Sequence, residues 1–146
     1  VFFRDSGSLR KVVLASKARV QALRLPAGTH IEFSSKSRVS RFNLPADARV
    51  QNVVFKGGTY RLRAPGMHRR HMARWWIGVY RNGKVSAGVL GRDVRLQGLW
   101  FKEGTHLQFH PNGRVKKGTL ARKAVYRGFR LPAGKAVEFD EKGKLI

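Results

Sequence analysis

Residues 67–72 read Met-His-Arg-Arg-His-Met and are the first place to look for metal chemistry. His68 and His71 would face one ion if this stretch were helical, and methionine sulfur is a soft ligand suited to copper. The two arginines between the histidines would repel a cation, and no carboxylate or thiolate lies nearby in the sequence. We therefore predict no metal site and no cofactor.

General acid–base catalysis usually needs paired carboxylates, and the one dense acidic group of this chain is Glu138, Asp140 and Glu141. Glu138 and Asp140 alternate outward around Phe139, which is typical of a solvated strand. The chain has no cysteine, no nucleophile elbow, no phosphate-cradling loop and no dinucleotide fingerprint. We therefore expect a protein that is not an enzyme and that has no small-molecule substrate.

The net charge of the chain points instead to an anionic partner. Its 146 residues include 31 Lys and Arg against 8 Asp and Glu, which gives a net charge of +23. Such an excess attracts phosphate-rich partners. An apolar fraction of 42% is enough for a folded core, so a disordered chain is not expected. The chain begins with Val1, which is compatible with removal of an upstream segment such as a signal peptide.

The segment 59–74, followed by two tryptophans, combines arginine with aromatic residues and contains no acid. Arginine binds phosphate bidentately, and guanidinium and indole planes stack on bases, while tryptophan also favours a membrane interface. We predict that the principal contact lies here and that basic positions elsewhere extend it. The predicted anion-binding residues are Arg61, Arg63, Arg69, Arg70, Arg74, Trp75, Arg19, Arg49, Arg95, Arg24 and Arg130.

An internal repeat of 30 residues must position these side chains. Residues 29–58 align without gaps on residues 105–134, and apolar, turn and glycine positions recur in the same columns. The chain is therefore predicted to be one β-repeat domain, 1–146, with copies 1–28, 29–58, 75–104 and 105–134, a partial copy 135–146 and an insertion 59–74. An insertion in a repeat array forms a loop on one face, which is often the binding face.

The repeat aligns basic residues on one face of the predicted array. Arg19, Arg49 and Arg95 share one column, and Arg24 and Arg130 share another. A third basic column follows the turn position and contains Arg38, Lys84, Arg114 and Lys144. Stacked copies would turn these columns into a basic stripe.

Each copy has the pattern of short strands separated by turns. Apolar and polar residues alternate in 31–33, and the Asn-Gly pairs at 82–83 and 112–113 are typical of hairpin turns. Because turn signals recur about every ten residues, we predict an all-β fold, either an antiparallel β-meander or a solenoid-like array.

The last run of each copy breaks the alternation. Val50 and Val53 cannot share one face of a regular strand, whereas Val53 and Phe55 can. The intervening column contains Ala22, Asn52, Gly98 and Gly128. We predict a β-bulge at this column.

Residues 78–84 (Gly-Val-Tyr-Arg-Asn-Gly-Lys) and 98–104 (Gly-Leu-Trp-Phe-Lys-Glu-Gly) give the chain a resemblance to MORN repeats, the membrane occupation and recognition nexus. It is also similar to uncharacterised bacterial envelope proteins with repeated segments. The 30-residue period is longer than the usual MORN unit, and the Tyr-x-Gly signature is mostly missing. The resemblance implies stacked β-hairpins, scaffolding, protein contacts and sometimes binding of acidic lipid, and it implies no chemistry.

Three functions are compatible with these features. The expected partner is a polyanion, either an anionic lipid or lipopolysaccharide surface or a nucleic acid, the latter as in a ribosome- or nucleoid-associated protein. The third alternative is a structural subunit or protein-interaction scaffold whose exposed edge strands are completed by neighbouring chains. The resemblance favours the bacterial envelope or periplasm over the cytoplasm.

Overall fold

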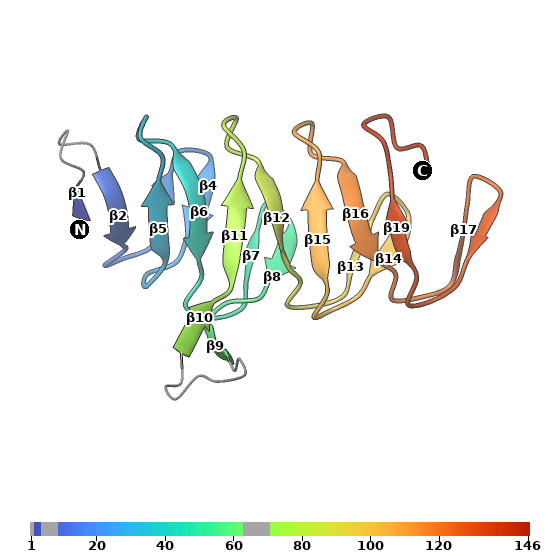
Figure 1. The fold of residues 1–146 in the computed structure, drawn as a ribbon, viewed down its shortest axis with the longest axis horizontal. Helices are drawn as coiled ribbons and strands as arrows, with labels where there is room; N and C mark the ends of the chain where they lie inside the picture. The colour runs from blue at the N-terminus through green and yellow to red at the C-terminus, as the bar shows by residue number, and fades with distance from the viewer. Residues whose placement is uncertain (1, 4–8, 63–70) are drawn as a thin grey trace.

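The regular structure of this protein is entirely β in the residues that its computed structural model describes, which are 2–3, 9–62 and 71–146. Nine strands of this part form one large antiparallel sheet in the order β1-β2-β5-β6-β11-β12-β15-β16-β19 (Figure 1). These strands are β1 (Phe2–Phe3), β2 (Leu9–Val13), β5 (His30–Phe33), β6 (Val39–Asn43), β11 (Trp76–Val79), β12 (Val85–Val89), β15 (His106–Phe109), β16 (Val115–Thr119) and β19 (Ala136–Glu138). The prediction of an all-β fold with antiparallel hairpin-like pairs is confirmed.

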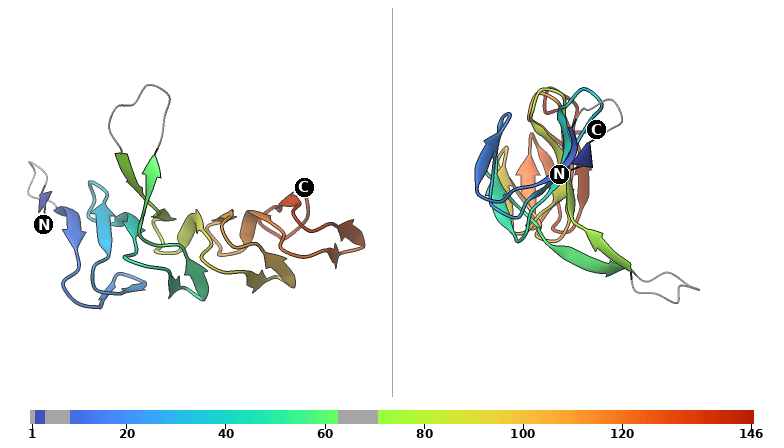
Figure 2. Two further views of the ribbon diagram at one scale, coloured as in Figure 1. Left: turned by 90° about the horizontal axis from the view of Figure 1, so that it is seen from below. Right: turned by 90° about the vertical axis from the view of Figure 1, so that its left-hand side faces the viewer.

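Four small two-stranded hairpins lie in a row over one face of the large sheet (Figures 1 and 2). They are β3 (Ala18–Val20) with β4 (Leu23–Leu25), β7 (Ala48–Val50) with β8 (Val53–Phe55), β13 (Val94–Leu96) with β14 (Leu99–Phe101), and β17 (Ala124–Tyr126) with β18 (Phe129–Leu131). The chain alternates between a hairpin of the large sheet and a small hairpin. The molecule is therefore elongated and has two layers.

The predicted β-bulge at Ala22, Asn52, Gly98 and Gly128 is wrong. Val50 pairs directly with Val53, so the residues between them form the two-residue turn of a small hairpin. Gln51 and Asn52 have φ angles of 50° and 69°, the positive values that a type I′ turn requires. Because cross-strand partners point to the same side, Val50 and Val53 are both buried without any bulge.

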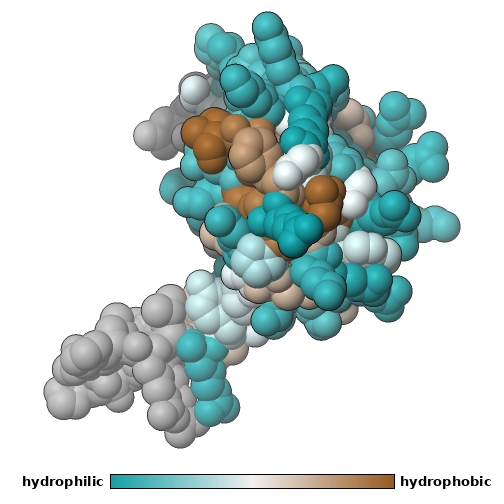
Figure 3. Space-filling view, turned by 90° about the vertical axis from the view of Figure 1, so that its right-hand side faces the viewer, coloured by the Kyte–Doolittle hydropathy of each residue, from teal (hydrophilic) through white to brown (hydrophobic). Residues whose placement is uncertain are grey.

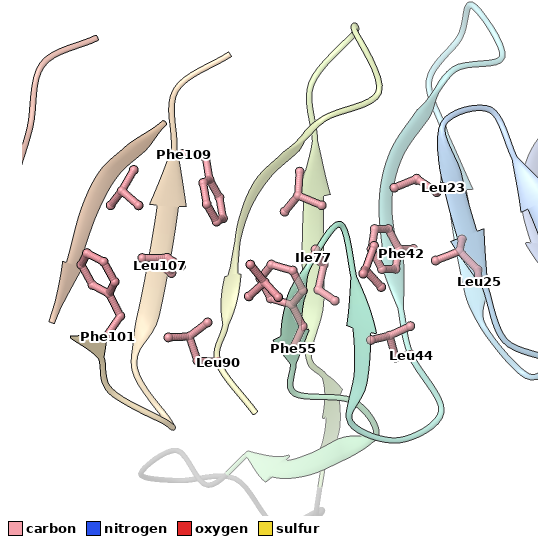
Figure 4. Packing of buried hydrophobic residues seen from close by; sticks show 14 of the residues in the cluster. Leu23, Leu25, Phe42, Leu44, Phe55, Ile77, Leu90, Phe101, Leu107 and Phe109 are labelled. Carbon is pink, nitrogen blue, oxygen red and sulfur yellow. The ribbon is translucent and has the colours of Figure 1, made fainter. Parts of the chain in front are cut away.

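The hydrophobic core lies between the large sheet and the small hairpins (Figure 4). Phe55 of β8 is fully buried and forms a bridge with Leu90, just beyond β12. The Lys56 amide donates a hydrogen bond to the Val89 carbonyl over 2.8 Å. This small hairpin therefore packs on sheet strands that follow it in the chain, and β14 does the same, because Phe101 bridges Leu120.

Two glycines of the sheet make room for the phenylalanines of the small hairpins. A Cβ atom at Gly88 would lie 2.7 Å from Cδ1 of Phe55, and one at Gly118 would lie 2.6 Å from Cδ1 of Phe101. Real carbon–carbon contacts are about 3.5–4.0 Å, so no larger residue fits without displacement.

Glutamine side chains fix the first three of the small hairpins that cover the large sheet to the next hairpin of that sheet. Gln51 Oε1 accepts a hydrogen bond from the Val85 amide over 3.0 Å, and its Nε2 donates to the Gly83 carbonyl over 2.9 Å. Gln21 makes the same two bonds to Val39 and Ser37. These contacts orient the opposite, outward face of the small hairpins toward solvent.

A fifth small hairpin, β9 (Thr59–Leu62) with β10 (His71–Arg74), projects away from the two layers (Figure 2). We call this hairpin the arm. It is built from the ends of the predicted insertion. In the described part of the chain there is no helix long and apolar enough to cross a membrane.

Candidate anion-binding surface

The central residue of each strand in the small hairpins points outward, because side chains alternate along a strand and its two neighbours point to the side of the large sheet. Arg19 lies opposite Arg24, and Arg95 lies opposite Trp100. Arg49 lies opposite Val54, and Arg130 lies opposite Val125. All five of these arginines are exposed, and we call them the arginine row: Arg19, Arg24, Arg49, Arg95 and Arg130. The predicted residues of both columns thus lie on the outward faces of the small hairpins.

The acidic side chains near the row are engaged by the backbone. Asp47 Oδ1 accepts a hydrogen bond from the Gly57 amide over 2.9 Å, and Asp93 Oδ1 accepts one from the Glu103 amide over 2.7 Å. The ion pairs found in the described residues join Glu32 to Lys11 and to Arg41, on the other face of the large sheet. Within this part of the chain, no carboxylate lies within ion-pair distance of the arginine row.

An aromatic residue interrupts the row at its centre. Trp100 occupies the outward position of β14, and the guanidinium of Arg122 lies 4.2 Å from its ring centroid. Sequence reasoning missed Arg122 because the contact joins two successive small hairpins. The corresponding positions in the other predicted copies are Ser16, Ala46 and Arg92, so this column is basic at only two of its four positions.

Residues at the base of the arm are used mainly in packing. Trp75 is half-buried, with its ring centroid 4.3 Å from that of Tyr60 and 4.9 Å from Lys56 Nζ. Arg74 is half-buried and its Nη1 donates to Asn43 Oδ1 over 3.3 Å. Of the predicted residues on the arm, only Arg61 is described as exposed. Arg63, Arg69 and Arg70 lie outside the described residues.

The third basic column of the sequence lies at the end of the turns that close the hairpins of the large sheet, which we call the wide turns. Its side chains form hydrogen bonds from one wide turn to the next. Arg38 Nη1 donates to the Arg81 carbonyl over 3.1 Å, and Arg114 Nη1 donates to the Lys142 carbonyl over 2.7 Å. Lys84 Nζ makes the equivalent bond to the next turn over 3.2 Å. This column therefore holds successive turns together, which distinguishes it from the arginine row.

The described histidines are dispersed. Burial, and then the nearby Arg74, lower the pKa of His30 below its usual value, which favours the neutral imidazole. The Nε2–H of His110 donates to the Phe139 carbonyl over 2.8 Å. No group of three His, Asp or Glu residues in 2–3, 9–62 and 71–146 could hold a metal ion.

The fold and this surface together define a class: an all-β protein with antiparallel hairpins and an unpaired basic face. Comparison with protein-family models, with curated proteins and with solved structures found no match to this chain. The resemblance to MORN repeats therefore stays a prediction from the sequence.

Proposed function

We propose that the chain is a tandem array of 30-residue β-repeats, each made of one hairpin of the large sheet and one small hairpin. The strand bounds support this unit. β12 begins at Val85 and β16 at Val115, and the small hairpins that follow begin at Val94 and Ala124. Each pair of positions is one 30-residue period apart. MORN-like stacking of hairpins is compatible with this arrangement.

We further propose that the array is a non-enzymatic binding module that docks on a phosphate-rich anionic partner through the arginine row. The observation that carries this proposal is the exposure of five arginines on the small hairpins without a carboxylate in ion-pair distance among the described residues. An anion would relieve the repulsion between these guanidinium groups and would accept their paired N–H donors.

The linear arrangement of the row favours an extended polyanion such as a nucleic acid. Each unit adds two strands to the large sheet, and strands lie about 4.8 Å apart, so successive units advance about 10 Å. Phosphates along one strand of B-DNA are spaced by about 3.4 Å along the axis. A single strand that keeps this stacked spacing would place about three nucleotides on each unit. The Trp100 ring and the Arg122 guanidinium that lies over it supply planar groups within the row on which a base can stack.

Salt-dependent binding to a fluorescent single-stranded oligonucleotide tests the proposal. Replacing Arg49, Arg95 and Arg130 by Gln removes three contacts and should reduce the slope of log K against log salt by about 2. The matched control replaces Lys36, Arg81 and Lys142, which lie at exposed wide turns, and should leave the slope almost unchanged. Equal effects of the two triple variants would show that net charge, and not the row, drives binding.

The same variants distinguish a membrane partner. If wild type binds vesicles containing phosphatidylglycerol and fails to bind the oligonucleotide at near-physiological salt, the partner is an anionic lipid or lipopolysaccharide surface. If wild type binds neither, polyanion docking is wrong.

A second candidate function is assembly with a protein neighbour. Phe129 of β18 is 59% exposed, whereas Leu99, one period earlier, is 1% exposed. Val125 of β17 is 70% exposed. Apolar residues gather at this end of the molecule, surrounded by hydrophilic ones (Figure 3). Self-association at high salt that Phe129→Ser abolishes would support this function, and a monomer at all concentrations would contradict self-association.

A further inference from the structure

A groove between the first two small hairpins brings together several arginines of the row. β4 contacts β7, and the groove between their hairpins has a volume of about 460 Å³. Its lining residues are Arg19, Ala22, Arg24, Arg49, Val50, Gln51 and Asn52. Three arginines of the row therefore converge on one groove, and no acidic residue lines it.

The register of β3 and β4 makes this concentration costly. Arg19 and Arg24 are direct cross-strand partners, and like charges in this relation destabilise a hairpin. Arg49 approaches the pair from the neighbouring hairpin. Arg19 Nε donates only a long bond of 3.4 Å to the Gln21 carbonyl, so the guanidinium forks retain donors for a ligand.

The other junctions between small hairpins do not repeat this chemistry. At the second junction the outward residues are Val54 of β8 and Arg95 of β13. At the third they are Trp100 of β14 and Val125 of β17, with the single guanidinium of Arg122 over the Trp100 ring. Because the register within each small hairpin is the same, the identity of the outward side chains distinguishes the three-arginine groove from the other junctions.

We propose that this groove binds a compact phosphate group with two or more negative charges, such as a phosphomonoester or a pyrophosphate. The proposal rests on the proposed function, because it identifies the part of the arginine row with the highest affinity. A phosphomonoester carries a charge of about −1.5 to −2 at pH 7 and has three acceptor oxygens. These match several guanidinium forks at once, whereas a phosphodiester offers one charge and two free oxygens.

Pyrophosphate and dimethyl phosphate are the probes that separate the two charge states. Titration of 15N-labelled full chain, followed through the arginine Nε–Hε signals, reports which side chains bind. Pyrophosphate should shift the signals of Arg19, Arg24 and Arg49 first and should bind at least tenfold more tightly than dimethyl phosphate. Equal affinities would overturn the proposal.

The row provides a matched control for each groove residue. Arg24→Gln and Arg49→Gln should each weaken pyrophosphate binding by about tenfold or more, because each removes a charge-assisted fork. Arg130→Gln and Arg95→Gln change the same columns outside the groove and should weaken it by less than about twofold. Similar losses in all four variants would refute a dedicated groove. Thermal unfolding of each variant verifies that the hairpin still folds.

Two further binding comparisons distinguish the source of the phosphate group. An oligonucleotide with a 5′-phosphate is compared with the same oligonucleotide without it, and phosphatidic acid vesicles are compared with phosphatidylglycerol vesicles. A preference for the monoester that Arg24→Gln removes supports the proposal and identifies the source. Polyanion binding without any such preference refutes the groove and leaves the proposed function intact. If pyrophosphate binds in the groove while both polyanions fail to bind, docking on an extended partner is wrong.

Discussion

The contact between Gly88 and Phe55 predicts a stability change that can be reversed by a second substitution. A methyl group at residue 88 would lie 2.7 Å and 3.0 Å from ring atoms of Phe55 and 3.3 Å from Cγ1 of Ile77. Over-packing of this kind costs about 1–3 kcal/mol, and the lower chain entropy of alanine offsets roughly 0.4–1 kcal/mol. We therefore expect Gly88→Ala to destabilise the protein by about 1–2 kcal/mol.

Phe55→Leu alone should also be destabilising, by about 1–2 kcal/mol, because it leaves a cavity against Gly88. In the double variant the alanine methyl group fills part of that cavity, so the two effects should not add. The proposed repeat already contains such an exchange, since Leu25 and Phe42 occupy the two corresponding positions. Both of these residues are buried, and they lie near each other in the core (Figure 4).

Equilibrium unfolding in urea, analysed as a double-mutant cycle, measures the coupling. We expect a favourable interaction energy of about 1–2 kcal/mol between the two substitutions. The mismatched double variant, Gly88→Ala with Phe101→Leu, places the changes at different contacts and should be additive within about 0.5 kcal/mol. Additivity in the matched pair as well would refute our inference that Gly88 is needed to make room for the Phe55 ring.

Two further predictions concern hydrogen bonds and charge. Gln51→Ala should destabilise the protein by about 1–3 kcal/mol in urea unfolding, because it removes the bonds to Gly83 and Val85; full stability would contradict the role of this side chain. The hydrogen bond from Arg41 is the main reason why the pKa of Glu32 lies below its ordinary value of 4.5. The ionised carboxylate therefore stabilises the folded protein above pH 4.5, and this contribution is lost as the pH falls through the lowered pKa. Glu32→Gln should therefore flatten the acid limb of a thermal-unfolding profile, and an unchanged limb would contradict this pairing.

The sequence predicted the strand content because local signals determine it. Alternation in 31–33 and the Asn-Gly pairs at 82–83 and 112–113 correspond to β5 and to the turns that follow β11 and β15. The hairpin turn at Gln51 was missed because glutamine is not a typical turn residue. Its side chain bonds to backbone groups more than thirty residues away, and a local pattern does not contain that information.

The candidate site was predictable from the sequence only as far as the repeat groups equivalent positions, and not in how these positions pack together. Recurrence along the chain marked Arg49 and Arg95 as one column and Arg24 as part of another, because the period alone groups equivalent positions. Recurrence could not indicate that Arg24 and Arg49 line one groove, since their distance depends on how one hairpin packs on the next. It also could not distinguish the wide-turn column, typified by Arg114, whose donors are used by neighbouring carbonyls.

The two faces of a small hairpin have different roles: the inward face stabilises the fold, and the outward face is free to bind a partner. The arginine row therefore indicates function better than the buried residues do. The inward positions carry the burial that stabilises the two layers, so their residues are constrained to be apolar. The outward positions make no comparable contribution, and Val54, Trp100 and Val125 occupy them as readily as arginine does. Folding therefore does not require arginine there. Arg19 opposite Arg24 even opposes folding, and an anionic ligand that lies between such side chains would convert this repulsion into affinity.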